Sequence, residues 1–202
     1  MLSGFKKYWF SVYKYNNSDK LFNDKKVIVF DTETTGLDCY RDEILQLSVI
    51  NGTGKVLFNE YIKPLYKCFW KKAEAIHGIS PRTVENCKHF KFHKRKIQRV
   101  FNKAKVLIAY NADFDLGFLR RAGIKINTDK KIIIDPMNDY SDYNHCKWQK
   151  LLVVARRYGY VFAAHDSLED VKATLFVAER FYNEVLPSVC SKEKCNGDIR
   201  KV

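Results

Sequence analysis

The stretch that decides the fold is VIVFDTETTG, residues 27–36. An apolar run of residues that favour β-structure leads into Asp31 and Glu33, which are separated by one residue. Because side chains two positions apart on a strand share a face, we expect the two carboxylates to lie side by side at the strand's end. Neighbouring carboxylates repel each other unless a cation lies between them, and hard ions such as Mg²⁺ prefer oxygen ligands.

Two further motifs carry acidic residues and a histidine. The stretch IAYNADFD, residues 108–115, indicates another buried strand that runs into a helix and ends at Asp115. The stretch HDSLED, residues 165–170, opens a long amphipathic helix and supplies His165 and Asp170. Carboxylates around a pair of divalent ions are the usual device for in-line displacement at phosphorus, and a histidine beside them can take a proton from the attacking water. The pattern therefore indicates metal-dependent hydrolysis of a phosphodiester.

The three motifs together resemble those of a known family. The strings Asp-Thr-Glu-Thr-Thr-Gly, Asn-Ala-x-Phe-Asp and His-x5-Asp are similar to the exonuclease motifs of the DEDDh family, which includes the proofreading epsilon subunit of DNA polymerase III, RNase T and oligoribonuclease. AIHGI, residues 75–79, is similar to a common element between the first two motifs, and the resemblance spans roughly residues 26–186. It implies a ribonuclease-H-like fold, two divalent metal ions (Mg²⁺ or Mn²⁺), and removal of nucleotides from 3′ ends as nucleoside 5′-monophosphates.

The resemblance also implies a role for each residue. Asp31, Glu33 and Asp170 would hold the first metal ion, which carries the attacking water. Asp31 would bridge to a second ion supported by Asp115, and His165 would be the general base. The loop expected to receive the terminal 3′ hydroxyl consists of Thr34, Thr35, Gly36 and Leu37. His77 and Phe114 are two further expected substrate contacts.

Several of these residues have other interpretations. Asp113 competes with Asp115, although the family pattern places its acid directly after the phenylalanine. The segment 167–170 also fits a helix capping box, which is the alternative role for Asp170; capping and metal ligation could share this position but not the same oxygen atoms. His77 could be a turn or packing residue, and Phe114 could belong to the helix core.

Composition favours a nucleic-acid partner. The chain of 202 residues has a net charge of +13 and a sequence pI near 9.4, so basic surface must lie away from the acidic site. The basic segment 88–99 is either part of such a surface or the solvated face of a helix. We expect single-stranded DNA or RNA 3′ ends as the partner, and a polymerase or another protein as a further possibility.

Location and organisation can also be predicted. No apolar stretch is long enough to span a membrane, and six cysteines without a CxxC pair suit free thiols in the cytoplasm. We expect an α/β fold with a mixed five-stranded sheet flanked by helices. Residues 1–25 are expected to form a basic, aromatic N-terminal extension, residues 26–186 the exonuclease domain, and residues 187–202 a disordered tail.

Two other function classes fit the same sequence. One is a nucleic-acid-binding or polymerase-associated module whose site is idle. The other is a hydrolase of small phosphodiesters. Turnover with Mn²⁺ or Mg²⁺ separates the first from an exonuclease, and competition between oligonucleotides and a model phosphodiester separates the second.

Overall fold

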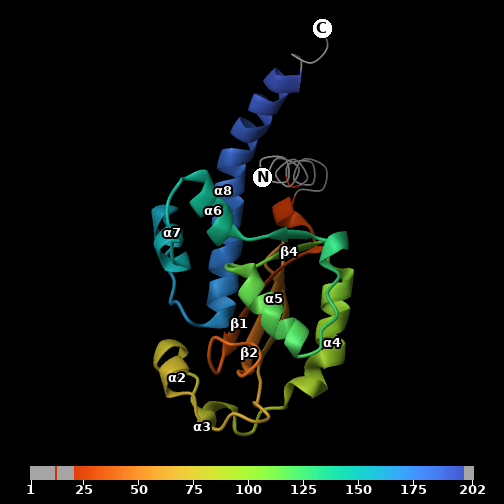
Figure 1. Ribbon diagram of the computed structural model, residues 1–202, viewed down its shortest axis with the longest axis vertical. Coiled ribbons are helices and arrows are strands. Elements are labelled where there is room, and N and C mark those ends of the chain that lie inside the picture. Colours follow the sequence, from red (N-terminus) through yellow and green to blue (C-terminus); the bar gives the residue numbers. More distant parts are fainter. Residues whose placement is uncertain (1–11, 13–20, 198–202) are drawn as a thin grey trace.

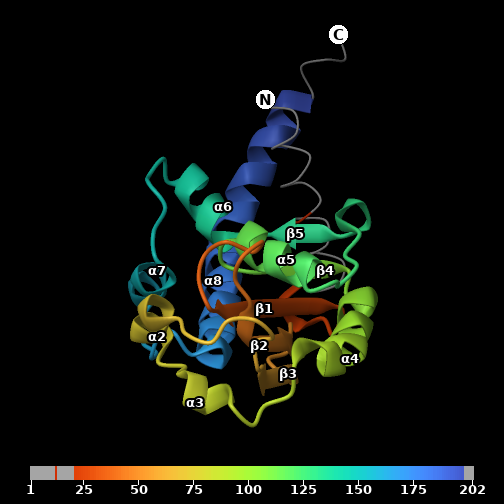
Figure 2. The same cartoon turned by 60° about the horizontal axis from the view of Figure 1, so that its bottom comes forward.

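The computed structural model describes Val12 and residues 21–197, with side chains described up to Pro187. Five strands form one mixed sheet in the order β3-β2-β1-β4-β5. They are β1 (Val27–Thr34), β2 (Ile44–Asn51), β3 (Val56–Tyr61), β4 (Val106–Ile108) and β5 (Ile132–Ile134). The first three form an antiparallel meander, and β4 and β5 are parallel to β1. Figure 2 shows the strands in this order, and the predicted mixed five-stranded sheet is confirmed.

Helices cover both faces of the sheet (Figures 1 and 2). On one face lie α6 (Pro136–Tyr143), α7 (Leu151–Arg157) and α8 (Ser167–Gly197), and on the other lie α4 (Phe90–Lys103) and α5 (Ala112–Arg121). Two short helices, α2 (Lys71–His77) and α3 (Pro81–Val84), extend beyond the end of the sheet. Two 3₁₀ turns, η1 (Leu21–Asn23) and η2 (Thr128–Lys130), complete the described elements.

The central strand β1 alternates between two hydrophobic cores. Val27 and Val29 belong to the core beneath α8, whereas Ile28 and Phe30 belong to the core beneath α4 and α5. Each of these four side chains is at most 1% exposed. Alternation along a strand has a period of two, so the odd-numbered residues that follow Val29 continue on the α8 face.

The helices differ from the expected ones in two places. Helix α6 was not expected, although its start carries an ordinary signal: Pro136 follows Asp135, whose side chain accepts hydrogen bonds from the N–H groups of Met137 and Asn138. Helix α8 runs through Pro187 to Gly197, into the segment expected to be a disordered tail. The long amphipathic helix expected after residues 165–170 is confirmed, and Val171, Ala178 and Tyr182 on its apolar face are fully buried.

The domain boundaries remain a prediction. Most of the expected extension, residues 1–25, and the last residues, 198–202, lie outside the described residues. Val12 and Leu21 are described, and both are buried in the core beneath α8. The four cysteines with described side chains are free thiols. Within the described part of the chain, no helix has the length and apolar character needed to cross a bilayer.

Candidate active site

Asp31 and Glu33 lie at the end of β1 on the face that α8 covers. The alternation set by Val27 and Val29 in the core continues through both acids, so the hydrophobic pattern of the strand places them. The strand ends at Thr34, where its register with β2 shifts. The sequence prediction that the two carboxylates share a face is consistent with this geometry.

The start of α8 is attached to β1 at the same point. The Ser167 hydroxyl donates a 2.9 Å hydrogen bond to the carbonyl oxygen of Asp31. The capping-box interpretation of residues 167–170 is therefore wrong: Asp166 caps the helix, because its Oδ1 accepts from the N–H groups of Leu168 and Glu169. Ser167, which is 0% exposed, instead joins two motifs that are far apart in the sequence.

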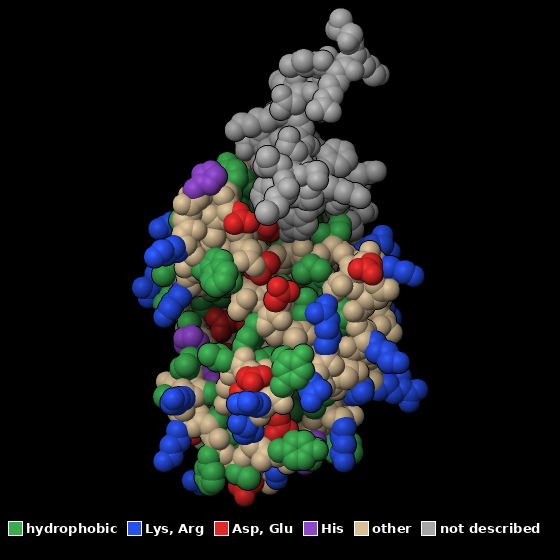
Figure 3. All heavy atoms as spheres, in the orientation of Figure 1, with side chains coloured by type: hydrophobic (Ala, Val, Ile, Leu, Met, Phe, Trp, Pro, Cys, Tyr) green, Lys and Arg blue, Asp and Glu red, His purple; other side chains and the backbone are tan. Residues whose placement is uncertain are grey.

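His165 and Asp170 are held together by the backbone. The His165 N–H donates to Asp170 Oδ2 at 2.9 Å, and His165 has a φ of 71°, in the left-handed region that few residues other than glycine adopt. This geometry leaves the imidazole exposed. One donor atom each from Glu33, His165 and Asp170 lie within 4.8 Å of one another. Figure 3 shows acidic side chains recessed in a hollow beside histidine side chains.

Asp115 approaches the site from α5. It is 2% exposed, and its Oδ1 accepts two hydrogen bonds from Thr32, one from the N–H at 2.8 Å and one from the hydroxyl at 2.6 Å. Two accepted bonds occupy Oδ1, so Oδ2 is the oxygen left for another ligand. Asp113, the competing residue, is exposed on the same helix turn. The geometry thus favours Asp115 as the acid that faces β1.

Asp135 fixes the position of α5. Its carboxylate accepts from the N–H groups of Asn111 and Ala112 at the start of α5 while it caps α6. Asn111 has a φ of 73°, a conformation that asparagine tolerates better than most residues. The carboxylate therefore links the two helix starts and sets where the first turn of α5, with Asp115, meets the sheet.

Burial raises the pKa of all four carboxyl groups of the site, and the charges of neighbouring acids add to the rise. Burial, followed by the charge of Asp170, raises the pKa of Asp31 to about 7. Burial and the charges of Asp31 and Asp170 raise the pKa of Glu33 to about 9, and burial raises that of Asp170 to about 6. Burial and the charge of Asp31 also raise the pKa of Asp115, against the hydrogen bonds from Thr32. Without a cation, these groups resist carrying their charges together.

The donor set fits a divalent metal ion. Asp31 Oδ2 is buried and has no hydrogen-bond partner within the described part of the protein. A buried carboxylate oxygen without a partner is costly, and a cation would satisfy it. The oxygens of Asp31, Glu33, Asp115 and Asp170 are the hard donors that Mg²⁺ and Mn²⁺ accept, and the His165 imidazole is a further possible donor.

The loop after β1 is rigidly hydrogen-bonded. The Thr34 hydroxyl donates to the Gly36 carbonyl at 2.6 Å, and the Thr35 hydroxyl donates to Asp42 Oδ1 at 3.1 Å. A Cβ on Gly36 would lie 2.4 Å from Asp42 Oδ2, so only glycine fits there without a shift of that carboxylate. Leu37, at 86% exposed, projects from the loop.

His77 supports this loop from α2. Its Nδ1 accepts from the Ile79 N–H at 3.0 Å, so the neutral ring carries its proton on Nε2 and donates to the Thr34 carbonyl at 3.1 Å. Burial lowers the pKa of His77, in agreement with a neutral ring. These two bonds connect the end of α2 to the loop after β1. Phe114 is half-buried and packs against Phe118, with ring centroids 4.9 Å apart.

Comparison with known proteins places this geometry in a family. The sequence model described as Exonuclease (RNase T) matches residues 28–178, which hold all the candidate residues. The chain belongs to this exonuclease family. The family resemblance inferred from the three motifs is thereby confirmed.

Solved structures share the fold. A complex of E. coli exonuclease I with single-stranded DNA superposes with a TM-score of 0.67 at 20% identity, covering 82% of this chain and 42% of that one. Exonuclease X in complex with 5′-overhanging duplex DNA gives a TM-score of 0.56 at 18% identity, covering 75% of this chain and 89% of that one. These similarities confirm the ribonuclease-H-like α/β fold.

Curated relatives are much longer than the matched region. A DNA polymerase III subunit epsilon-like protein of Rhodobacter capsulatus is 32% identical over 174 residues, covering 80% of this chain and 24% of the relative. A PolC-type DNA polymerase III of Thermotoga maritima is 35% identical over 113 residues, covering 52% of this chain and 8% of the relative. The chain thus spans a quarter or less of the length of these relatives.

The raised pKa values predict a pH-dependent stability. A carboxyl whose folded pKa exceeds its unfolded value binds its proton more tightly in the folded protein, so stability falls as pH rises between the two values. For Glu33 this window runs from about 4.5 to about 9. In EDTA, urea unfolding should show a free energy of unfolding that falls across this window. The fall should be smaller in Glu33→Gln and in wild-type protein with saturating Mg²⁺. Identical pH dependence in all three samples would contradict the raised pKa of Glu33.

The Thr32 hydroxyl predicts an effect on metal affinity. Thr32→Val keeps the backbone bond to Asp115 but removes the 2.6 Å hydroxyl bond, so the carboxylate keeps only one of its two restraints. Titration calorimetry should show Mn²⁺ binding weakened about tenfold to a hundredfold, as for other residues that orient metal ligands. Asp113→Ala, which alters the exposed acid on the same helix, is the control and should bind Mn²⁺ normally. Normal affinity in Thr32→Val with weak binding in Asp113→Ala would assign the site to the other aspartate.

Proposed function

We propose that the protein is a 3′-5′ exonuclease of the DEDDh type that hydrolyses phosphodiester bonds at nucleic-acid 3′ ends and releases nucleoside 5′-monophosphates. The observation that carries the proposal is the convergence of Glu33, His165 and Asp170 donor atoms within 4.8 Å, beside the unpartnered buried Oδ2 of Asp31. Membership in the exonuclease family supports it. The recurrence of the fold in exonuclease complexes with DNA is consistent with it.

The carboxylates would hold two divalent ions, Mg²⁺ or Mn²⁺. Asp31, Glu33 and Asp170 would form one site, and Asp31 and Asp115 the other. When bound, such ions would make water a stronger nucleophile and offset the negative charge that develops on the phosphate. The chain's own part is orientation: Thr32 holds Asp115, Ser167 holds the Asp31 backbone, and the His165 N–H holds Asp170.

His165 is proposed as the general base. Its imidazole is exposed, while one ring nitrogen lies near the carboxylate oxygens of Glu33 and Asp170. The imidazole can therefore reach a water held at those carboxylates and pass the proton on to solvent.

The loop of Thr34, Thr35, Gly36 and Leu37 is proposed to receive the terminal nucleotide. Hydrogen bonds to Asp42 and His77 fix its backbone, and Leu37 projects from it to pack against the terminal sugar or base. Phe114, next to Asp115, would provide an aromatic contact nearby. Contacts of this kind select an end and its hydroxyl more than a base.

A polymerase is a proposed partner. The relatives of this chain include a protein named as epsilon-like and others named as PolC-type DNA polymerase III, and the chain covers only part of each. The domain is therefore proposed to act as a nuclease module beside a polymerase or to act alone, on DNA or RNA.

Direction and mode of attack are tested with end-labelled substrates. A 5′-labelled single strand of DNA or RNA should shorten one nucleotide at a time in Mg²⁺ or Mn²⁺, and EDTA should stop the reaction. A 3′-phosphate should inhibit, because it adds bulk and charge where the hydroxyl should bind. Rapid cutting of a circular single strand would refute exonuclease action. Hydrolysis of a model phosphodiester in preference to the oligonucleotides would point to a small-substrate hydrolase, and no turnover with either metal would indicate an idle binding module.

The role of His165 is tested with His165→Asn, which keeps a polar side chain but cannot accept the proton. Its single-turnover rate should fall about a hundredfold to ten-thousandfold, the usual contribution of general acid–base catalysis. The wild-type rate should rise through mildly acidic pH and then level, and the variant should lack this rise while it still binds Mn²⁺.

Metal-dependent ionisation of water can imitate that pH profile, so it should be recorded in both Mg²⁺ and Mn²⁺. A rise that persists in His165→Asn and moves with the metal would assign the ionisation to water and remove His165 from this role.

A further inference from the structure

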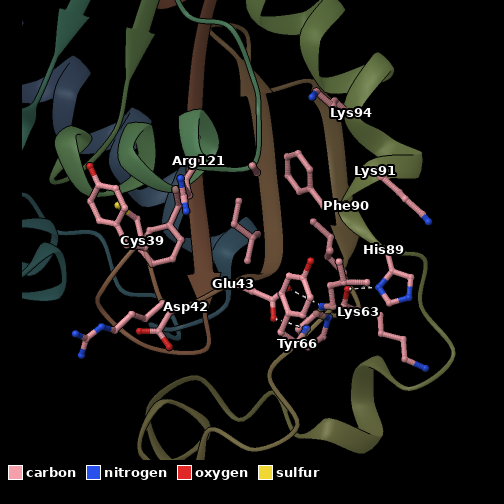
Figure 4. A pocket seen from close by; sticks show the side chains of 18 residues that line it. Cys39, Asp42, Glu43, Lys63, Tyr66, His89, Phe90, Lys91, Lys94 and Arg121 are labelled. Atoms are coloured by element: carbon pink, nitrogen blue, oxygen red, sulfur yellow. Dashed lines mark hydrogen bonds between the residues drawn. The ribbon is translucent and has the colours of Figure 1, made fainter.

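A cavity of about 470 Å³ lies on the α4–α5 side of the molecule (Figure 4). Four segments enclose it: the loop before β2, the chain after β3, the first turn of α4 and the last turn of α5. Its volume falls within the range of about 300–1,000 Å³ that is typical of small-ligand pockets. None of the residues assigned to catalysis or to the 3′ end lines it.

Aromatic rings line the cavity. The Phe90 ring points into it from the first turn of α4, and the Tyr66 ring lies across its lower side (Figure 4). Tyr66 is 83% exposed and Tyr40, which also lines the cavity, is 76% exposed, so both rings are accessible to a ligand. Exposed aromatic faces are the usual stacking platforms for the bases of single-stranded nucleic acids.

Three exposed cations lie at the rim of the cavity, and the Lys91 ammonium points away from it, 5.1 Å from the centroid of the Phe92 ring. Lys91 and Lys94 come from α4 and Arg121 comes from the end of α5 (Figure 4). In the part of the chain whose side chains are described, none of the three pairs with a carboxylate. The Arg121 guanidinium lies 5.2 Å from the centroid of the Tyr40 ring, where it can also stack on a base.

The acidic residues of the cavity are already engaged. Asp42 pairs with Lys67 at 3.0 Å and accepts hydrogen bonds from the loop. Glu43 accepts from three consecutive backbone N–H groups, at 2.6–2.8 Å, which belong to Leu65, Tyr66 and Lys67. Five cationic side chains line the cavity against these two carboxylates, so its net charge is positive. Aromatic faces beside unpaired cations match the chemistry of a nucleotide, which has a flat base and an anionic phosphate.

The cavity is connected to the candidate active site by one loop. Thr35, in the segment proposed to receive the 3′ end, donates its hydroxyl hydrogen bond to Asp42 and accepts one from the Glu43 N–H. Asp42 and Glu43 line the cavity. The cavity and the loop proposed to receive the 3′ end are therefore adjacent.

We propose that the cavity is a second nucleic-acid subsite, which binds one upstream nucleotide of the substrate's own single strand while the 3′ end occupies the active site. This inference rests on the proposed function. The base stacks on Phe90 and Tyr66, and Lys91, Lys94 and Arg121 contact the adjoining phosphates. The enzyme therefore binds long single strands more tightly than short ones.

The test is equilibrium binding in Ca²⁺, measured by fluorescence anisotropy with 5′-fluorescein-labelled oligothymidylates and oligouridylates of 3 and 12 nucleotides. The wild-type protein should bind the 12-mer at least about tenfold more tightly than the 3-mer. In the triple variant Lys91→Glu/Lys94→Glu/Arg121→Glu, the ratio of the affinity for the 12-mer to that for the 3-mer should fall close to one. The salt slope of this variant for the 12-mer should decrease by about 0.7 for each phosphate that the protein no longer neutralises.

Two further variants keep the result specific. Lys55→Glu/Lys103→Glu/Lys130→Glu makes the same charge change at three exposed lysines that do not line the cavity, and it should keep the wild-type ratio. Tyr40→Ala/Tyr66→Ala removes exposed rings without altering charge, and it should also reduce the ratio. Thermal melting in EDTA checks that each variant is folded.

Other ligands give other outcomes. Equal wild-type affinity for both lengths, or an equal effect of the two triple variants, would overturn the subsite. If unlabelled thymidine or uridine 5′-monophosphate reduces 12-mer binding to the level of the 3-mer, the cavity binds a free nucleotide. If the 12-mer binds more tightly than the 3-mer only when a complementary strand is present, the cavity binds the second strand.

Turnover of the 3-mer in Mn²⁺ is measured in parallel. Turnover with length-independent binding overturns the subsite alone, whereas length-dependent binding without turnover overturns the proposed activity alone.

Discussion

Electrostatic repulsion among buried carboxylates is the constraint on which the structure depends. Four acids meet at the end of β1, where burial raises the pKa values of Asp31, Glu33 and Asp170 and the charges of the other site acids add to the rise for Asp31 and Glu33. A fold has little reason to gather such groups for stability, since each adds a desolvation penalty. The arrangement becomes favourable when cations enter it, and the unpartnered Oδ2 of Asp31 is the atom that most clearly requires one.

The scaffold meets this constraint through neighbouring hydrogen bonds. Among the described residues, each candidate acid but Glu33 is bonded to a supporting residue. Thr32 bonds to Asp115 and Ser167 bonds to Asp31, and both bonds join different motifs. The His165 N–H bonds to Asp170 at the other end of the same motif. The motifs are thereby locked to one another by contacts that need no metal. This explains how the chain can hold acids in place against their repulsion, and why changes in the supporting residues should alter metal binding without removing a ligand.

Much of this arrangement could be predicted from the sequence. The apolar run before Asp31 and its period of two placed the strand and both acids on one face, and the stripe of Val171, Ala178 and Tyr182 defined α8. Such signals are local, since each depends on the periodicity of one element. Helix α6 could also have been found from the Asp135–Pro136 pair, a common start of a helix.

Other features could not be read from the sequence, because they arise between elements. Nothing local shows that Ser167 bonds to Asp31 while Asp166 caps α8, since either residue can serve as a cap. The role of His77 depends on which carbonyl it meets, and the cavity forms only when α4, α5 and two loops come together. Net charge indicated an anionic partner but gave no position for the cations that remain unpaired around the cavity.

The central claim is that the carboxylates at the end of β1 form a divalent-metal site. The most direct measurement is anomalous diffraction from crystals of the protein grown with Mn²⁺. The account predicts an anomalous peak within ligand distance of Asp31 Oδ2, also coordinated by Glu33 and Asp170, with a second peak shared by Asp31 and Asp115. The account would be contradicted if such crystals showed no anomalous peak at Asp31 and its Oδ2 were bonded only to water or protein.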